Sequence, residues 1–148
     1  MRLTLEKVLI LKNVPLFAGI PEATLSDIVA ASEEITVMIG TDLIREGEAW
    51  NDMYIILQGQ IRFHKNGTTV REYNALDVFG ELTALDPAPA DITVTALEDT
   101  TLFKISGPAL YRLMNEHKAL GKNIIRMLCR RIKSMRAQTF ETTQKDPA

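Results

Sequence analysis

The chain has 148 residues, of which 46% are hydrophobic and 24% charged, and its formal net charge is −2 at pH 7. This length suits one globular domain and excludes a second sizeable one, and the hydrophobic share excludes a disordered chain. A single cysteine, Cys129, excludes an internal disulfide, and the sequence has no apolar run long enough for a signal peptide or a membrane span, so we expect a cytoplasmic protein.

The charges are spread unevenly along the chain. Residues 1–116 carry nine basic and seventeen acidic side chains, whereas residues 117–140 carry seven basic side chains and no acidic one. Because the overall balance is not basic, we expect no nucleic-acid partner. The pattern predicts an acidic body followed by a basic C-terminal segment.

Two types of hydrophobic pattern divide the body of the chain. Over residues 1–34 apolar side chains recur at helical spacing, and Pro21 starts the second of two predicted helices. Residues 35–105 instead hold short runs of branched and aromatic residues separated by turn signals, which favours a sandwich or barrel of strands. Asn66-Gly67 predicts a hairpin, because both positions of a type I′ turn need positive φ.

Residues 106–138 are predicted to form two helices, with Ser106 as a cap and Pro108 in the first turn. Along residues 118–136, apolar and basic positions each recur every three or four residues on opposite sides of the helix. We expect Cys129, beside the apolar stripe, to be buried and unreactive, and the polar tail 139–148 to fray. The apolar stripe consists of Leu120, Ile124, Leu128, Ile132 and Met135, and we expect the first four to be buried against the barrel or a second subunit.

The sequence offers little support for an enzyme. It contains no nucleophile elbow, no phosphate-binding P-loop and no zinc-protease motif. The two histidines, His64 and His117, lie far apart and have no cysteine pair nearby to complete a metal site. We therefore expect no catalytic residues, no metal and no cofactor.

The segment Phe79-Gly80-Glu81-Leu82-Thr83 is the most informative one. A glycine that follows a strand and opens a short helical turn exposes backbone N–H groups that hold anions, and an adjacent glutamate accepts hydrogen bonds from sugar hydroxyls. A tight turn that merely joins two strands explains the same residues, and spacing alone favours that simpler interpretation.

The order of motifs over about residues 11–135 resembles the cyclic nucleotide-binding domains of catabolite activator-type regulators, regulatory subunits of cAMP-dependent protein kinase and gated channels. The resemblance implies a mainly β fold with flanking helices: an eight-stranded antiparallel jelly-roll barrel over residues 35–105, within a single domain spanning residues 1–138. It rests on Val14-Pro15-Leu16-Phe17, on Gly40, Gly47 and Gly59 with Tyr54, on Phe79 to Leu82, and on Thr93 to Ala96.

The resemblance also implies a binding site for a cyclic nucleotide such as cAMP or cGMP. In such domains the short helix after the FGE turn is a phosphate cassette, in which Gly80, Leu82 and Thr83 would hold the cyclic phosphate and Glu81 the ribose 2′-OH. The last helix usually closes over the base as a lid or packs as a dimer seam. The stripe residues assigned to that role are Leu120, Ile124, Leu128 and Ile132.

One departure from the family pattern concerns the phosphate. Members that bind cyclic nucleotides usually continue as P-R-[AST]-A-T-V, and the arginine pairs with the phosphate. This chain has Ala90 at that position, followed by Asp91. Asn74 and Leu76, in the region before the cassette, and Trp50, in an earlier turn, also stand where the family often has glycines. The strand before the cassette contributes Val70 and Arg71, and Arg71 is a candidate substitute cation.

Two hypotheses follow. In the first, the chain is a regulatory or sensor module that binds cAMP, cGMP or a related small anionic ligand weakly in its cassette. In the second, it is a ligand-free protein–protein interaction module with a degenerate pocket. Its basic amphipathic C-terminal helix then engages a separate effector protein or a second copy of the chain.

Overall fold

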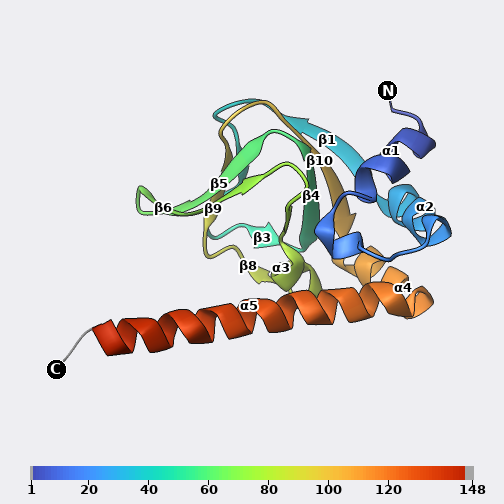
Figure 1. Ribbon diagram of the computed structural model, residues 1–148. Helices are drawn as coiled ribbons and strands as arrows, with labels where there is room; N and C mark the ends of the chain where they lie inside the picture. Colours follow the sequence, from blue (N-terminus) through green and yellow to red (C-terminus); the bar gives the residue numbers. More distant parts are fainter. Residues whose placement is uncertain (1, 146–148) are drawn as a thin grey trace.

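Two four-stranded antiparallel sheets form a jelly roll flanked by helices in the computed structural model, which describes residues 2–145 (Figure 1). Before the strands come α1 (Thr4–Leu11), the 3₁₀ turn η1 (Pro15–Phe17) and α2 (Glu22–Ala31). After them come α4 (Gly107–Glu116) and α5 (Lys118–Lys145). The predicted jelly roll, with helices on its N-terminal and C-terminal sides, is confirmed.

The first sheet has the order β1-β10-β4-β7 and the second the order β2-β9-β5-β6, while β3 and β8 pair as a short ribbon. A short helix, α3 (Glu81–Leu85), separates β7 from β8. The strands are β1 (Glu33–Val37), β2 (Asp42–Ile44), β3 (Ala49–Trp50), β4 (Asp52–Gln58), β5 (Gln60–Lys65), β6 (Thr68–Asn74), β7 (Val78–Phe79), β8 (Ala88–Pro89), β9 (Thr93–Ala96) and β10 (Thr100–Ser106).

The predicted hairpin joins β5 to β6. Lys65 pairs with Thr68, and the two residues between them, Asn66 and Gly67, have φ values of 53° and 77°. Positive φ at both positions is the requirement of a type I′ turn, so this local prediction is confirmed.

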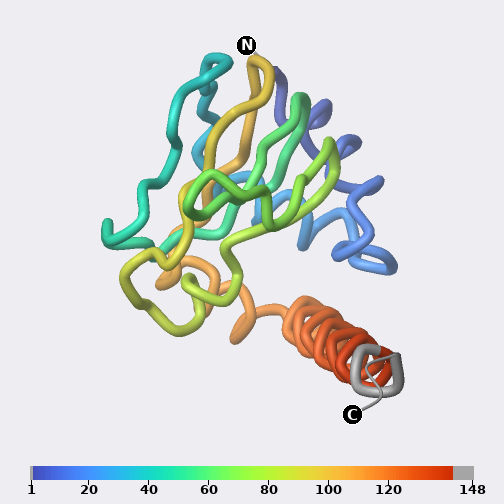
Figure 2. Tube along the Cα trace, turned by 90° about the vertical axis from the view of Figure 1, so that its left-hand side faces the viewer, coloured from blue at the N-terminus to red at the C-terminus, as the bar shows by residue number. Residues whose placement is uncertain are grey.

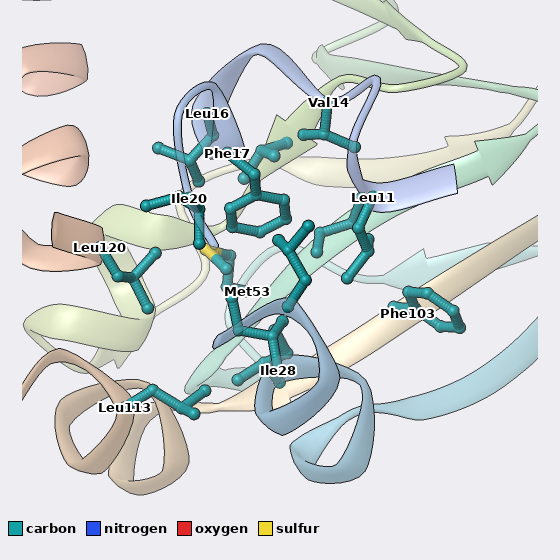
Figure 3. Packing of buried hydrophobic residues seen from close by; sticks show 14 of the residues in the cluster. Leu11, Val14, Leu16, Phe17, Ile20, Ile28, Met53, Phe103, Leu113 and Leu120 are labelled. Atoms are coloured by element: carbon teal, nitrogen blue, oxygen red, sulfur yellow. The ribbon is translucent and has the colours of Figure 1, made fainter. Parts of the chain in front are cut away.

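Strand β4 lies between two hydrophobic cores. Met53 and Ile55 face a core formed with the N-terminal helices, α4 and α5 (Figure 3), whereas Tyr54 and Ile56 face the interior of the jelly roll. Side chains of a strand alternate between its two faces, so burial on both sides explains the continuous apolar run of this strand. Leu120 of α5 belongs to the first core, and this contact anchors the start of α5.

Helix α4 begins at the predicted cap, where the hydroxyl of Ser106 accepts a hydrogen bond from the backbone N–H of Ala109 at 3.2 Å. Helix α5 then runs along one side of the jelly roll as a long rod (Figures 1 and 2). It continues to Lys145, so the expected end at residue 138 is wrong. The physical reason is that no glycine or proline interrupts the sequence between Gly121 and Pro147.

The apolar stripe of α5 is buried only along its first half. Leu120 and Ile124 are buried and Leu128 is half-buried, but Ile132 is 64% exposed. Each step of four residues turns the stripe by about 40° around the helix axis, and this rotation carries Ile132 away from the body. Cys129, expected to be buried, is exposed, because it lies about 140° around the helix axis from the buried Ile124. Within residues 2–145, no helix combines the length and the apolar character that a membrane crossing requires.

Candidate functional site

Gly80 is held tightly between β7 and α3. Its φ of 83° lies in the left-handed region, and a Cβ atom there would lie 2.4 Å from the carbonyl oxygen of Asp52 and 3.0 Å from the indole ring of Trp50. Both the backbone conformation and the space therefore require glycine at this position. The chain can enter α3 from the barrel wall only because this residue has no side chain.

The first turn of α3 lies where the sequence predicts an anion-binding cradle. The first backbone N–H groups of a helix have no partner within it, which leaves those of Glu81, Leu82 and Thr83 without one inside α3. Leu82 is 62% exposed, and the hydroxyl of Thr83 donates to the carbonyl oxygen of Gly80 at 3.2 Å. These residues, Gly80 to Thr83, form the segment that we call the cassette.

Glu81 is buried and paired with a cation from the last helix. Glu81 is 1% exposed, and its Oε1 atom forms an ion pair with the guanidinium group of Arg131 on α5. Its Oε2 atom is buried and has no hydrogen-bond partner in the described part of the chain. Burial lowers the pKa of Arg131, the nearby Arg71 charge lowers it further, and Tyr73 opposes both effects.

The position expected to hold the arginine is part of the hydrophobic core. Ala90 is 3% exposed and belongs to the core inside the jelly roll. Its N–H donates to the carbonyl oxygen of Glu48 at 2.8 Å, and its carbonyl accepts from the N–H of Gly47 at 2.7 Å. Asp91 is exposed. The structure brings Arg131 to the cassette as its cation, and that cation is already paired with Glu81.

Aromatic rings fill the interior behind the cassette. The Nε1–H of Trp50 donates to the carbonyl oxygen of Asp52 at 2.8 Å, and its ring meets Phe79 edge to face with centroids 6.4 Å apart. Tyr54 stacks on Phe79 with centroids 5.1 Å apart. Burial raises the pKa of Tyr54 well above its ordinary value, so its hydroxyl stays neutral.

The cassette helix also contacts α4 directly. The hydroxyl of Tyr111 donates to the carbonyl oxygen of Leu85 at the end of α3. At the start of α4, a Cβ atom on Gly107 would lie 2.4 Å from the carbonyl oxygen of Ala84, which shows how closely the two backbones approach. Helix α3 is thus tied to α4 at one end and to α5, through Glu81, at the other.

Arg71 and Val70 lie on β6, and the charge of Arg71 acts on Arg131, the partner of Glu81. Val70 is 63% exposed. The guanidinium carbon of Arg71 lies 4.6 Å from the ring centroid of Tyr73, and both residues line a cavity against α5. No cassette residue lines that cavity.

Two residues of this site, Trp50 and Arg131, were not predicted from the sequence. Trp50 was noted only for standing where the family often has glycine, and its contact with Gly80 was not expected. Arg131 was counted only as one of the basic residues of the helix. Its spacing carried a signal, however, because it follows Ile124 by seven residues and so lies on the buried face rather than on the cationic one.

Among residues 2–145, no group of three or more histidine, cysteine, aspartate or glutamate side chains is arranged to hold a metal ion.

Comparisons with known proteins agree on the domain type. The sequence profile described as "Cyclic nucleotide-binding domain" matches residues 34–117. A CRP-like cAMP-activated global transcriptional regulator of Mycobacterium tuberculosis is 24% identical over 130 residues, which cover 84% of this chain and 58% of that protein. A cAMP-dependent protein kinase regulatory subunit of Aspergillus niger is 29% identical over 106 residues, covering 70% of this chain and 26% of the relative.

Solved structures show the same fold. The catabolite activator protein of Thermus thermophilus superposes with a TM-score of 0.79 at 20% identity, covering 87% of this chain and 63% of that one. The sensor domain of the transcriptional regulator DNR from Pseudomonas aeruginosa gives a TM-score of 0.78 at 19% identity, covering 91% and 94% of the two chains. The present chain thus spans little more than half the length of the regulator from M. tuberculosis.

Proposed function

The chain belongs to the cyclic nucleotide-binding domain family, and we propose that it is a non-catalytic regulatory module whose cassette binds cAMP and cGMP only weakly. The observation that carries this proposal is the burial of Ala90 in the core, at the position where the family pattern has its phosphate-binding arginine. The cassette keeps its backbone amides but has no arginine there to neutralise a cyclic phosphate.

The missing charge is worth a large share of the affinity. Truncating one partner of a buried hydrogen-bonded charge pair costs about 2–5 kcal/mol, which corresponds to roughly thirty-fold to several-thousand-fold in Kd. Backbone N–H groups still offer hydrogen bonds to the phosphate. Asp91, which follows Ala90, adds a negative charge near the expected phosphate position. Together these features favour weak binding.

Glu81 remains suited to a sugar hydroxyl. One oxygen of its carboxylate is engaged by Arg131, whereas Oε2 is buried and unpartnered in the described structure. A buried acceptor without a donor is unfavourable, and a ligand hydroxyl would satisfy it. The ribose side of the family site is therefore retained, while the phosphate side has lost its strongest partner.

The output of such a module would be the position of α5. Helix α3 contacts α4 through Tyr111 and contacts α5 through Arg131, so a ligand that moved the cassette would act on both C-terminal helices. The side chain of Asn123 donates to the carbonyl oxygens of Leu16 and Ala18, at 2.8 and 3.1 Å, and holds α5 to η1. A regulatory signal therefore has a physical route from the cassette to α5.

Titration with cAMP and cGMP tests the proposal. The chain has one tryptophan, Trp50, and its ring touches Gly80, so its fluorescence reports on the cassette alongside calorimetry. We expect a Kd near or above about 1 mM and a small thermal shift at that ligand concentration. A shift of many degrees at micromolar cAMP would contradict the proposal.

A gain-of-affinity variant tests the cause. Trp50 and Ala90 belong to the same packed core inside the jelly roll, so an arginine side chain at position 90 needs space there, and removing the indole ring supplies it. We expect Trp50→Gly with Ala90→Arg and Asp91→Ala to bind cAMP at least about tenfold more tightly than the wild type. Ala90→Arg with Asp91→Ala should gain less, and Asp91→Ala alone least.

Circular dichroism on each variant provides the folding control for this series. If the triple variant is folded and gains nothing, the missing arginine is not what limits affinity, and the ligand-free interpretation is preferred.

A second candidate function, a ligand-free interaction module, is favoured by the outer surface of α5. Four large apolar side chains are exposed along this cationic helix: Ile125, Ile132, Met135 and Phe140, with exposed fractions of 59%, 64%, 65% and 63%. Such a row suits a partner helix. If the partner is a second copy of the chain, sedimentation should detect a dimer that Ile132→Glu dissociates and Lys133→Glu leaves intact. A wild-type monomer at about 100 μM would exclude this homodimer.

A further inference from the structure

A cavity of about 390 Å³ lies outside the cassette, between η1, the segment from β6 to β7, and α5. Its volume falls within the usual range for small-molecule sites, about 300–1,000 Å³. Its polar and charged lining consists of Arg71, Tyr73, Asp77, Asn123, Arg126, Arg130 and Arg131.

The charge of this cavity is strongly positive. Four arginines line it against one carboxylate, that of Asp77, whose Oδ2 already accepts a hydrogen bond from the N–H of Asn74 at 2.8 Å. Among residues 2–145, no ion pair joins Arg71, Arg126 or Arg130 to a carboxylate. A cavity that gathers three such cations has the electrostatic character of an anion site.

Two of these cations are held close together although they repel each other. Arg71 belongs to β6 and Arg131 to α5, and the charge of Arg71 contributes to the lowered pKa of Arg131. Arg71 is also held over the ring of Tyr73, which restricts its guanidinium group. An anion placed between β6 and α5 would relieve the repulsion and would meet a donor that is already oriented.

The rest of the wall is apolar. Leu16 and Val78 are buried, and Leu76 and Met127 are half-buried members of the cavity lining. An inorganic ion would leave this surface exposed to water, whereas an organic group would cover it. The cavity therefore combines the two features that recognise a small organic anion: a cluster of arginines and an apolar wall.

We propose that this cavity binds a small organic phosphate, whose phosphoryl group is held by Arg71, Arg126 and Arg130 and whose apolar part rests against Leu76 and Met127. Arginine favours phosphate because its planar fork of N–H groups matches two phosphate oxygens at once. No cassette residue lines this cavity, although Arg131 is shared between the cavity wall and the ion pair with Glu81. The site would act on the same helix, because Arg131 borders the cavity and pairs with Glu81.

Calorimetry with phenyl phosphate and inorganic phosphate, at constant ionic strength, tests the site. We expect phenyl phosphate to bind the wild-type chain with a Kd below about 1 mM and at least about tenfold more tightly than inorganic phosphate. Arg71→Gln and Arg130→Gln should each weaken binding of phenyl phosphate about fivefold or more. Arg136→Gln, on the same helix but outside the cavity lining, should leave it unchanged.

A further variant separates the cavity from the cassette. Leu82 is exposed in the cassette, so Leu82→Asp would repel an anion bound to the cassette amides but not one in the cavity. We expect Leu82→Asp to bind phenyl phosphate like the wild type. The proposal would be overturned if Leu82→Asp lost binding, or if Arg136→Gln weakened binding as much as Arg130→Gln. It would also be overturned if the two phosphates bound with equal affinity, or if no binding were detected at about 10 mM. Circular dichroism confirms that each variant is folded.

Discussion

Replacing Arg131 by methionine tests whether the ion pair with Glu81 holds α5 against the cassette. The two side chains differ in environment: that of Glu81 is 2% exposed, and that of Arg131 is 28% exposed. Arg131→Met keeps most of the apolar stem but removes the charge, so the carboxylate of Glu81 is left buried without a cation. Its other oxygen already has no partner in the described structure, and this leaves the carboxylate with little compensation.

The expected cost follows from that asymmetry. Breaking a buried pair by removing one partner costs about 3–5 kcal/mol, and we expect the lower end because Arg131 is partly solvated. For a chain of this size, a loss of about 3 kcal/mol lowers Tm by roughly 6–12 °C. Glu81→Gln should cost only about 1 kcal/mol, because the freed guanidinium group is able to reach solvent. The double variant should lose less than the sum of the two single variants.

Urea unfolding followed by circular dichroism at pH 7 measures these differences, and Arg136→Met serves as the control. Arg136 is exposed on the same helix, so its replacement should change the free energy of unfolding by less than about 0.5 kcal/mol. Trp50 fluorescence adds a local readout, since its ring touches Gly80 beside Glu81. If Arg131→Met destabilises the chain no more than Arg136→Met does, the ion pair does not hold α5 and the reasoning is refuted.

Three further predictions concern the fold. Leu120→Ala should lower the free energy of unfolding in urea by about 2–5 kcal/mol, whereas Lys122→Ala, at an exposed position, should lower it by less than about 0.5 kcal/mol. Equal losses would mean that the buried face of the helix was misassigned. Gly59→Ala places a Cβ atom 2.7 Å from the Cα atom of Thr100, so it should lower Tm far more than Gly40→Ala, whose Cβ meets nothing within 4 Å. Because the pKa of Tyr54 is raised in the folded state, the contribution of Tyr54 to stability is complete below pH 10.0 and is lost as the pH rises further. The urea concentration at the unfolding midpoint should therefore fall with rising pH above 10.0, and it should fall less steeply in Tyr54→Phe.

Much of the fold could be predicted from the sequence, because the patterns that specify its turns and helix caps involve residues close together in the chain. Asn66-Gly67 specifies its turn through the φ values that two adjacent residues tolerate, and Ser106 caps α4 through a contact three residues away. The length of α5 was harder to predict, because its polar last turns show no apolar period. Their helical state follows instead from the absence of a breaker before Pro147.

The cassette site could be predicted only in part, because its main side-chain contacts join residues that are distant in the chain. Gly80 and Glu81 were found from the order of motifs, and the structure places them at the start of α3. The partner of Glu81 comes from a helix whose path along the barrel no local pattern fixes. Trp50, whose ring lies beside Gly80, belongs to β3, a strand of two residues that is too short to give a strand signal in the sequence.

The placement of the arginines along α5 shows how one helix serves two kinds of contact. Arg126 and Arg130 differ by four residues and lie on the exposed side, where the cavity meets solvent, whereas Arg131 is turned by about 100° from Arg130 toward the buried side. A single rotation or shift of α5 would therefore change the ion pair with Glu81 and the arginine cluster together. Because the start of α5 is anchored in the core by Leu120 and Ile124, such a motion would be largest in the half of the helix that carries Ile132. The same half presents the exposed apolar row, so a partner bound there and a ligand bound at either site would be coupled through one rigid element.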